Sequence, residues 1–294
     1  MQKNELERFS VLSKLNVLYK ILEVRKQVSR WKSEGLTVGL VPTMGGLHDG
    51  HKSLINSASK KCDKVIVTIF INPTQFGDDE DLDTYPRTQK SDITLISDAG
   101  GTAVFIPNVS EMYPSDFSTK VSVSGLTDML CGTSRPGHFD GVTQIVTKLL
   151  NQVAADMAFF GEKDWQQLAI IRRLVRDLDI PTKIASVATV RDEFGLALSS
   201  RNSYFSSSQL KTARKLSSVL QMTAYNIASG GYASVECAKA VQTLLKSGFD
   251  KIDYIECRHS HSLEAIERTT EDECRIFAAA YIDNIRLIDN HVVV

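Results

Sequence analysis

Residues 42–51 of the chain, PTMGGLHDGH, combine glycines and histidines in a pattern suited to phosphate chemistry. Gly45, Gly46 and Gly50 allow the backbone to turn sharply and to approach a ligand closely. At the N-terminus of a helix, exposed backbone N–H groups and a partial positive charge attract anions. The pattern therefore predicts a phosphate site, although a glycine-rich turn after a strand is often only a connection.

His48 and His51 are three residues apart, so both can face one ligand from the first turn of a helix that begins near Asp49. An imidazole donates a hydrogen bond when it is neutral and adds positive charge when it is protonated. Two histidines at this spacing can also form half of a zinc site, but no glutamate base separates them and no third ligand is nearby. We therefore expect the histidines to act on a phosphate, and we predict no metal-ligating residues.

Strands and helices on either side of this stretch would position it. A short apolar strand, residues 37–41, should end at Pro42, because proline cannot donate to a sheet ladder. Residues 64–71 form a nearly continuous apolar run, typical of a strand buried on both faces of a parallel sheet. Further strands are predicted at 103–106, 157–160 and 184–190, and helices at 11–33, 49–61, 89–99, 142–152 and 165–178. This alternation predicts an α/β fold, a Rossmann-like open parallel sheet with helices on both faces and ligands at the carboxyl ends of its strands.

The last third of the chain has a different pattern. Amphipathic helices are predicted at 207–228 and 234–247, and strands at 252–257 and 275–281. We therefore expect two domains: residues 1–187 as the Rossmann-like domain that binds nucleotide and substrate, and residues 188–294 as a smaller C-terminal α+β lid domain.

Polar residues gather in the loops that follow the predicted strands. Asn72 and Gln75 have side-chain amides that donate and accept hydrogen bonds, as recognition of a small hydroxy acid requires. Lys163 is placed to neutralise a phosphate, while Asp164 can cap a helix or hold a ribose hydroxyl.

Ser199, Ser200 and Arg201 place two hydroxyls beside a guanidinium, a combination that suits a phosphate clamp. Each of these loops, taken alone, is about equally typical of an ordinary polar turn.

Composition excludes several classes of protein. The chain has 294 residues, 43% of them hydrophobic, and a net charge of −1 from 34 basic and 35 acidic residues. This balance gives no overall field for nucleic acid or an anionic membrane, so we expect small-molecule partners. The N-terminal residues are polar and the longest apolar runs are far shorter than a bilayer span, which predicts a cytoplasmic protein. Five widely spaced cysteines without a Cys-x-x-Cys pair predict reduced, structural thiols.

The order of these loops resembles that of a known family. The strings PTMGGLHDGH, INPTQFG, DLDTYPRT, RPGHFDGV, FGEKDWQQL and GLALSSRN, which span residues 42–202, are similar to those of the pantothenate synthetases, or pantoate–β-alanine ligases, of the nucleotidylyltransferase superfamily. The resemblance implies condensation of (R)-pantoate with β-alanine, driven by ATP as a substrate, to give pantothenate, AMP and pyrophosphate through a pantoyl-adenylate intermediate. It also implies Mg²⁺ that arrives with ATP, a homodimer, and a flexible lid at residues 77–84.

The resemblance assigns site residues position by position. Gln75 and Gln167 would hold pantoate, Gln75 would also lie near β-alanine, and His51 would occupy the family's proton-donor position. Charge that develops on the phosphates would be stabilised by four catalytic residues, His48, His51, Lys163 and Arg201. The ATP site would be formed by Met44, Gly45, Gly46, Leu47, His48, Asp49, Gly50, His51, Gly161, Glu162, Lys163, Asp164, Val190, Leu198, Ser199, Ser200 and Arg201.

Two other functions fit part of the pattern. An adenylyltransferase that acts on a phosphorylated cofactor precursor would share the first loop, but it would not need NPTQFG or GEKD-x-QQL. A catalytically inactive nucleotide-binding regulator would be expected to lack His48, His51 or Lys163, and all three are present.

Overall fold

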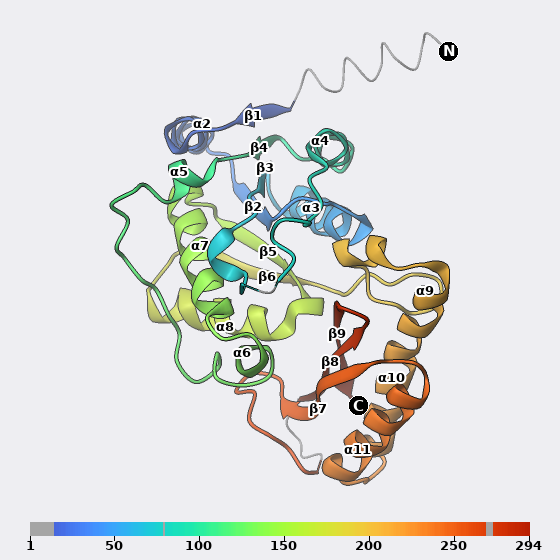
Figure 1. Ribbon diagram of the computed structural model, residues 1–294. Coiled ribbons are helices and arrows are strands. Elements are labelled where there is room, and N and C mark those ends of the chain that lie inside the picture. Colours follow the sequence, from blue (N-terminus) through green and yellow to red (C-terminus); the bar gives the residue numbers. More distant parts are fainter. Residues whose placement is uncertain (1–14, 79, 269–272) are drawn as a thin grey trace. The chain divides into compact units, whose positions relative to one another are not determined.

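The structure, a computed structural model, describes residues 15–78, 80–268 and 273–294 (Figure 1). Contacts between residues divide the chain into two compact units. The first unit contains the described residues up to Val123, Pro136–Gly161 and Ile170–Val187, and the second contains Ser124–Arg135, Glu162–Ala169 and Ala188–Val294. The last change of unit falls between residues 187 and 188, where the sequence predicts a domain boundary; the assignment of a lid function beyond it stays a prediction.

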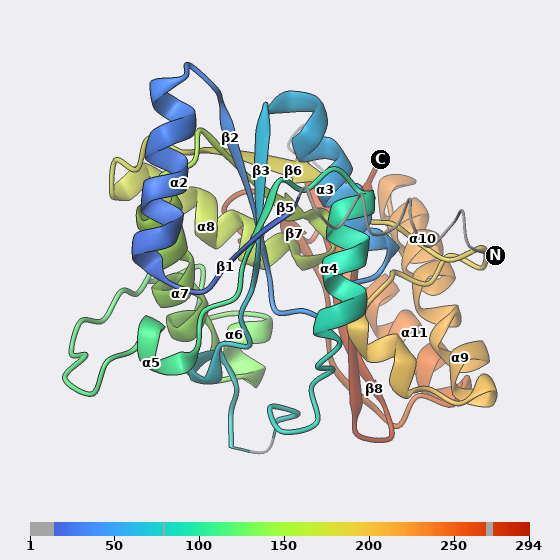
Figure 2. The ribbon, with the colours of Figure 1, turned by 90° about the horizontal axis from the view of Figure 1, so that it is seen from above.

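A six-stranded parallel sheet forms the centre of the first unit. Its strands are β1 (Asn16–Leu18), β2 (Val38–Thr43), β3 (Lys64–Ile69), β4 (Ala103–Phe105), β5 (Met157–Gly161) and β6 (Lys183–Val187), in the order β1-β4-β3-β2-β5-β6. Helices α2 (Ile21–Ser33) and α7 (His138–Val153) lie on one face, and α3 (Asp49–Lys61) and α4 (Gln89–Asp98) lie on the other (Figure 2). Because both faces are covered, β2 and β3 are almost wholly buried. The predicted fold class, an open parallel sheet with helices on both faces, is confirmed.

Short helical segments complete the connections. They are η1 (Pro73–Gln75) after β3, α5 (Val109–Met112) after β4, α6 (Cys131–Ser134), and η2 (Glu162–Asp164) with α8 (Trp165–Asp177) after β5.

The helix predicted over residues 11–33 is wrong at its start. Asn16–Leu18 form β1, the edge strand of the sheet, and α2 begins only at Ile21. The N–H of Asn16 donates to the carbonyl of Thr102 at 3.2 Å, so the strand depends on a partner far away in the sequence. Helical spacing of apolar residues does not report such a partner. Residues 11–14 of the predicted helix lie outside the described residues.

The prediction that Pro42 ends its strand is also wrong. β2 continues to Thr43, and Pro42 lies opposite Thr68 of β3. On the other side of β2 the ladder with β5 pairs only Gly39 and Leu40. Proline is therefore accommodated where one side of the strand has no ladder to interrupt.

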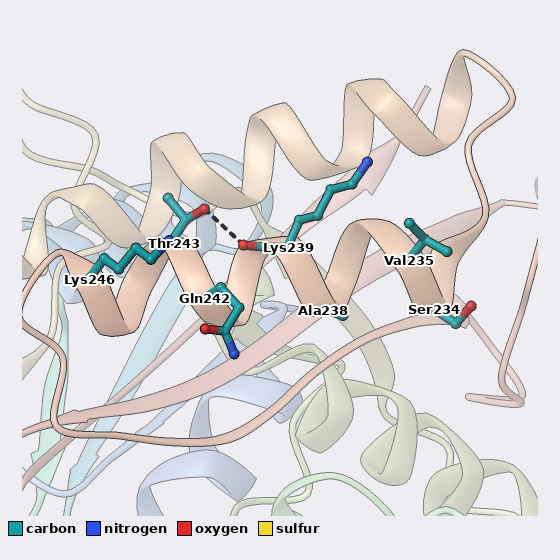
Figure 3. Close-up of a pocket in the computed structure, with 7 residues that line it drawn as sticks. All are labelled: Ser234, Val235, Ala238, Lys239, Gln242, Thr243 and Lys246. Atoms are coloured by element: carbon teal, nitrogen blue, oxygen red, sulfur yellow. Dashed lines mark hydrogen bonds between the residues drawn. The ribbon is translucent and has the colours of Figure 1, made fainter.

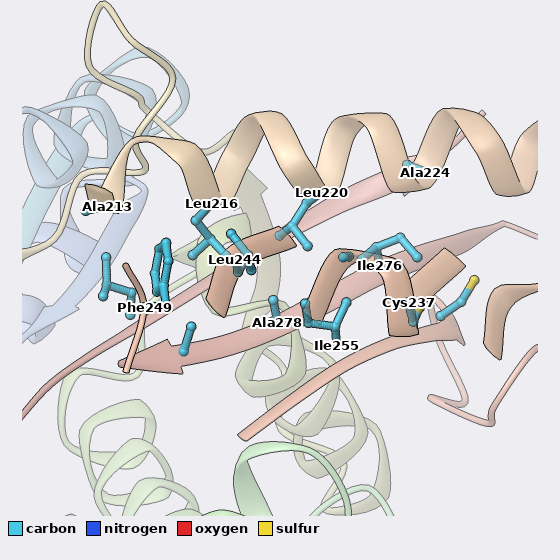
Figure 4. Close-up of a cluster of buried hydrophobic side chains, with 14 of the residues drawn as sticks. Ala213, Leu216, Leu220, Ala224, Cys237, Leu244, Phe249, Ile255, Ile276 and Ala278 are labelled. Carbon is cyan, nitrogen blue, oxygen red and sulfur yellow. The ribbon is translucent and has the colours of Figure 1, made fainter. Parts of the chain in front are cut away.

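The second unit contains a three-stranded antiparallel sheet packed on helices. Its strands are β7 (Lys251–His259), β8 (Cys274–Ile282) and β9 (Ile285–Val293), and its helices include η3 (Ser200–Tyr204), α9 (Ser207–Ala213), α10 (Lys215–Ala228) and α11 (Ala233–Lys246). Apolar side chains of α10, α11 and the sheet interlock in one core, among them Leu216, Leu220, Leu244, Ile255 and Ile276 (Figure 4). This is the predicted small α+β fold.

Two features of this unit differ from the predictions. The helix predicted at 207–228 is divided at Arg214 into α9 and α10. β9 was not predicted, because Asp289, Asn290 and His291 interrupt its apolar pattern with polar residues.

All five cysteines are buried and free, as predicted. Among the described helices, none combines the length and the apolar character that a membrane span needs.

Candidate active site

The turn after β2 is held by one buried carboxylate. Asp92 of α4, which is 2% exposed, accepts hydrogen bonds from the N–H groups of Gly46 at 3.1 Å and Leu47 at 2.9 Å. It also accepts one from the hydroxyl of Thr88 at 3.1 Å. Gly45 has a φ of +88°, and a Cβ there would lie 3.3 Å from the Asp92 carboxylate. The turn therefore needs glycine, and its backbone donors are held by Asp92.

Two histidine rings cap the N-terminus of α3, which begins at this turn. The N–H of Gly50 donates to Nδ1 of His48 at 3.1 Å, and the N–H of His48 donates to Nδ1 of His51 at 3.3 Å. The two ring centroids are 4.2 Å apart. Because each Nδ1 accepts a hydrogen bond, each neutral ring carries its proton on Nε2 and is a donor there.

Burial of one face of α3 fixes the position of this cap. Leu54, Ile55 and Ala58 are buried, and the helix contacts β2, β3 and β5. Asp49 in the first turn favours the helix electrostatically, because the N-terminus carries a partial positive charge.

Gln75 lies in η1, beside the glycine-rich turn. Its Oε1 accepts from Nδ2 of Asn72 at 3.0 Å, and its Nε2 lies 3.0 Å from Sδ of Met44. Asn72, which is 1% exposed, also donates to the carbonyl of Gly141 at 3.1 Å and accepts from the hydroxyl of Tyr113 at 2.9 Å. Burial raises the pKa of Tyr113, so its hydroxyl stays protonated and remains a donor. The carboxamide of Gln75 is thus oriented by a buried network.

α7 packs directly on η1. A Cβ at Gly141 would lie 2.3 Å from the carbonyl oxygen of Thr74, so only glycine fits there. Nδ1 of His138 lies 2.8 Å from the carbonyl oxygen of Gln75. α7 begins at His138, before the predicted start at Val142, so part of the RPGHFDGV string is helical and holds η1.

Arg87 ties down the acidic loop after η1. Its guanidinium donates to the carbonyls of Asp83 at 2.7 Å and Leu82 at 3.2 Å. Asp79, which is part of the predicted lid at 77–84, lies outside the described residues.

In the second unit, the turn η2 carries Lys163 and Asp164. Nζ of Lys163 lies 3.8 Å from Oδ1 of Asp164, a loose ion pair, and the Lys163 side chain is 20% exposed. Asn290 of β9 holds the backbone of the turn, because its Nδ2 donates to the carbonyls of Glu162 at 2.9 Å and Lys163 at 3.0 Å. The backbone from which the Lys163 side chain extends is therefore held by β9.

A hairpin joins two predicted nucleotide contacts, Val190 and Leu198. The N–H of Leu198 donates to the carbonyl of Val190 at 2.9 Å. The strand predicted at 184–190 is therefore wrong at its end, because β6 ends at Val187 and Val190 belongs to the hairpin. Arg191 forms a two-point ion pair with Asp289 of β9, at 2.6 and 2.9 Å. Burial alone would raise the pKa of Asp289, but the neighbouring His291 ring and the ion pair with Arg191 lower it below its usual value.

Ser199, Ser200 and Arg201 lie together at the start of η3. Oγ of Ser199 accepts from the N–H of Arg201 at 3.3 Å and caps the segment. Nδ2 of Asn202 donates to the carbonyl of Ala197 at 3.1 Å, which ties η3 to the hairpin.

Of the two adjacent glutamines in the FGEKDWQQL string, only Gln167 is available to a ligand. Gln166 is buried, donates to the carbonyl of Leu126 at 2.9 Å and accepts from the N–H of Cys131 at 3.0 Å. Gln167 is partly exposed, and its side chain has no hydrogen bond to any residue that the structure describes.

The predicted site residues fall into two groups. Met44–His51, Gln75 and Gly161 belong to the first unit, and Glu162–Asp164, Gln167, Val190 and Leu198–Arg201 belong to the second. Within the described ranges, no cluster of three or more histidine, cysteine or acidic side chains is arranged to bind a metal ion.

A groove of about 800 Å³ on α11 holds none of these residues (Figure 3). It is lined by Ser234, Val235, Ala238, Lys239, Gln242, Thr243 and Lys246. The hydroxyl of Thr243 donates to the carbonyl of Lys239 at 2.8 Å and is thus engaged within the helix. Nothing in the groove combines a nucleophile, a base and an anion contact, so we assign no chemistry to it.

A family model described as pantoate-beta-alanine ligase matches residues 16–292. The chain belongs to the pantoate–β-alanine ligase family. It is therefore an enzyme, a ligase of this family, and the resemblance found in its loops is confirmed.

Relatives of this family match nearly the whole chain. The pantothenate synthetase of Dinoroseobacter shibae is 50% identical over 275 residues, which are 94% of this chain and 98% of that protein. The crystal structure of pantothenate synthetase from Thermus thermophilus is 39% identical, with a TM-score of 0.87 over 94% of this chain and 98% of that one. A pantoate-beta-alanine ligase from Francisella tularensis, described as complexed with beta-gamma ATP and beta-alanine, is 33% identical, with a TM-score of 0.79 over 95% of this chain and 97% of that one.

Three polar residues that support the site were not predicted: Asp92, Asp289 and Asn290. Asp92 had a detectable signal, since it lies four residues before the buried Ile96 and so shares the apolar face of its helix. The other two lie on β9, and the site segments that they hold, at Arg191 and at Glu162, are about 100 or more residues away in the chain.

Proposed function

We propose that the chain catalyses the ATP-dependent condensation of (R)-pantoate with β-alanine to give pantothenate, AMP and pyrophosphate. The observation that carries the proposal is the family match over residues 16–292. The ligands named for the Francisella tularensis relative, an ATP species and β-alanine, are two of the substrates that this reaction needs. The product would serve pantothenate and coenzyme A biosynthesis.

The reaction has two steps with a pantoyl-adenylate intermediate. In the first step a carboxylate oxygen of pantoate attacks the α-phosphate of ATP, and the bond to the β-phosphate breaks, so pyrophosphate leaves with Mg²⁺ that arrived on ATP. In the second step the amine of β-alanine attacks the acyl carbon, loses a proton, and displaces AMP. No covalent bond to the protein forms.

Catalysis by these residues is electrostatic and positional. Negative charge develops on phosphate oxygens in the first step, and donors directed at that charge lower the barrier. Nε2 of His48 and Nε2 of His51 are donors of this kind, the N-terminus of α3 contributes a partial positive charge, and Lys163 and Arg201 add full positive charges. His51 donates a proton or hydrogen bond to the departing phosphate.

Substrate positions follow from the same assignment. Gln75, oriented by Asn72, binds pantoate and lies near β-alanine, and Gln167 binds pantoate with its available carboxamide. ATP contacts Met44–His51, Gly161–Asp164, Val190 and Leu198–Arg201.

We also propose a cytoplasmic homodimer, on the family resemblance alone. Light scattering of the purified chain tests the dimer.

The test is pyrophosphate release from ATP, Mg²⁺ and (R)-pantoate, measured with and without β-alanine, followed by detection of AMP and pantothenate. Pyrophosphate formed with pantoate alone, and AMP with pantothenate formed only after β-alanine is added, would support both steps. His51→Ala should remove most of the activity. His261→Ala is the matched control, because His261 is exposed and belongs to no predicted site segment.

Binding of ATP without pantoate-dependent pyrophosphate release would overturn the ligase proposal. An adenylyltransferase acting on a phosphorylated cofactor precursor would then release pyrophosphate with that precursor instead. A catalytically inactive regulator would bind ATP and release none.

A further inference from the structure

Two consecutive residues of β9, Asp289 and Asn290, hold two separate segments of the proposed nucleotide site. Each is 4% exposed. Successive side chains of a strand point to opposite faces of its sheet, so one dipeptide can support a segment on each face. All of the residues concerned belong to the second unit.

Asn290 uses its whole carboxamide. Nδ2 donates to the carbonyls of Glu162 at 2.9 Å and Lys163 at 3.0 Å, and Oδ1 accepts from Nη1 of Arg275 at 2.6 Å. The Arg275 guanidinium in turn stacks over the Trp165 ring, 3.4 Å from its centroid. Asn290 therefore links η2 to β9, and Arg275 links the residue that follows η2, Trp165, to β8.

Asp289 holds the other segment through Arg191. The two side chains form a two-point ion pair, and Nη1 of Arg191 also donates to the carbonyl of Gly195 at 3.0 Å and the hydroxyl of Ser217 at 3.2 Å. Asp289 is deeply buried, which excludes the water that weakens exposed ion pairs. Asp289 thus holds Arg191, which lies at the start of the hairpin that leads into Ser199–Arg201.

We infer that Asp289 and Asn290 are positioning residues for ATP: they set the spacing between the Lys163 turn and the hairpin that leads to Arg201. Neither touches the reacting atoms. Their effect is to hold the backbone turn of Lys163 and the hairpin that leads to Arg201, two cationic residues that lie 38 residues apart in the sequence. Preorganised charge of this kind stabilises a phosphoryl-transfer transition state without reorganisation during the reaction. The inference rests on the proposed function, since that function assigns both segments to ATP.

The first test is Asn290→Asp, which keeps the shape of the side chain and its acceptor for Arg275. The new oxygen faces the two carbonyls that Nδ2 now binds, so the turn at Lys163 is repelled rather than held. We expect the Kd for ATP, measured by calorimetry, to rise about tenfold, the equivalent of about one lost hydrogen bond. We expect kcat to fall by about ten- to a hundredfold as Lys163 is displaced, with KM for β-alanine unchanged. Asn290→Ser, which adds no charge, takes its place if Asn290→Asp does not fold.

The second test is Asp289→Asn, which removes the charge that binds Arg191 without changing shape. The matched control is Asp253→Asn, because Asp253 is a buried partner of Arg286, at 2.9 Å, in the same unit and touches neither nucleotide segment. Both substitutions should lower Tm. Only Asp289→Asn should also weaken ATP binding and lower kcat.

The outcomes separate this inference from the proposed function. If the unsubstituted chain forms pantothenate and the two β9 variants keep its Kd for ATP and its kcat, the positioning role is wrong and the function stands. If the Asp253→Asn control loses ATP affinity as much as Asp289→Asn does, general destabilisation explains the result and the inference fails. If the unsubstituted chain binds ATP but forms no pantothenate, the function fails, and the Kd for ATP in the β9 variants still decides the positioning role.

Discussion

Asp92→Asn tests whether a buried carboxylate holds the turn that we propose binds phosphate. The Asp92 carboxylate accepts hydrogen bonds from the N–H groups of Gly46 and Leu47 and the hydroxyl of Thr88. The substitution keeps the shape of the side chain but removes its charge. The NH₂ group of the new asparagine then faces one of the N–H or hydroxyl groups that donate to Asp92, and two donors cannot bond to each other. The turn should then lose one or two of its bonds to Asp92 and move.

The size of the effect follows from the charge and the burial of the group. A hydrogen bond to a charged group contributes about 1.5–3 kcal/mol, so losing one or two should lower the free energy of unfolding by about 2–4 kcal/mol. For a unit of this size, Tm then falls by roughly 5–15 °C. Because the turn also carries His48, and a displacement of about 1 Å can cost about a hundredfold in rate, kcat/KM for ATP should fall by about 10–100-fold.

Scanning calorimetry and the pyrophosphate assay, run on the same preparation, measure both effects. Asp98→Asn is the matched control, because it makes the same chemical change on the same helix at an exposed position. It should leave Tm and kcat/KM nearly unchanged. An Asp92→Asn variant that keeps the kcat/KM for ATP of the unsubstituted chain would refute the view that Asp92 positions the turn.

Three further predictions follow from burial and packing. Gly141→Ala places a Cβ 2.3 Å from the carbonyl oxygen of Thr74, so it should cost about 1–3 kcal/mol and raise the KM for pantoate; an unchanged Tm would contradict the packing argument. Burial raises the pKa of Cys257 to about 12, so its thiol should resist iodoacetamide at pH 8 until denaturant is added, and rapid labelling of the native chain by mass spectrometry would count against this. Burial alone would raise the pKa of Asp253, but its ion pairs lower it below the ordinary 3.8, so the stability that it adds at neutral pH should be lost as acid protonates it. The difference in the free energy of unfolding between the unsubstituted chain and Asp253→Asn should therefore become smaller below about pH 4. A difference that does not change with pH would show that the charge of Asp253 adds no stability.

The residues of the candidate site were predictable where their chemistry is local. The turn before α3 has glycines because Gly45 and Gly46 have positive φ, and the histidines cap the helix that the apolar spacing of Leu54, Ile55 and Ala58 predicts. The buried strand at 64–71 was evident because both of its faces are apolar. In each case one short segment contains both the residue and the reason for its conformation.

The errors have the opposite cause. β1 depends on a ladder with β4, Pro42 is accepted because the β5 ladder stops before it, and β9 pairs with β8 despite its polar centre. β9 follows β8 directly and was missed because polar residues interrupt its apolar pattern, but the strands that explain β1 and Pro42 lie outside the window over which periodicity is measured. The same reason hides the contacts of Asn290, because a lone asparagine in a strand has no pattern that names Glu162 and Lys163 as its partners.

Sequence thus identifies the groups that we propose contact phosphate, while buried polar side chains from other elements determine the positions of those groups. Lys163 and His48 have recognisable types at recognisable positions, but Lys163 depends on Asn290, and the turn that carries His48 depends on Asp92. Removing Lys163 or His48 would abolish a proposed phosphate contact and reveal little about the geometry of the site. Substitutions that preserve shape at Asp92 and Asn290 leave every proposed phosphate contact in the chain and change only its position. If catalysis here is electrostatic preorganisation, those two variants should therefore lose rate while keeping all of the groups that the mechanism uses.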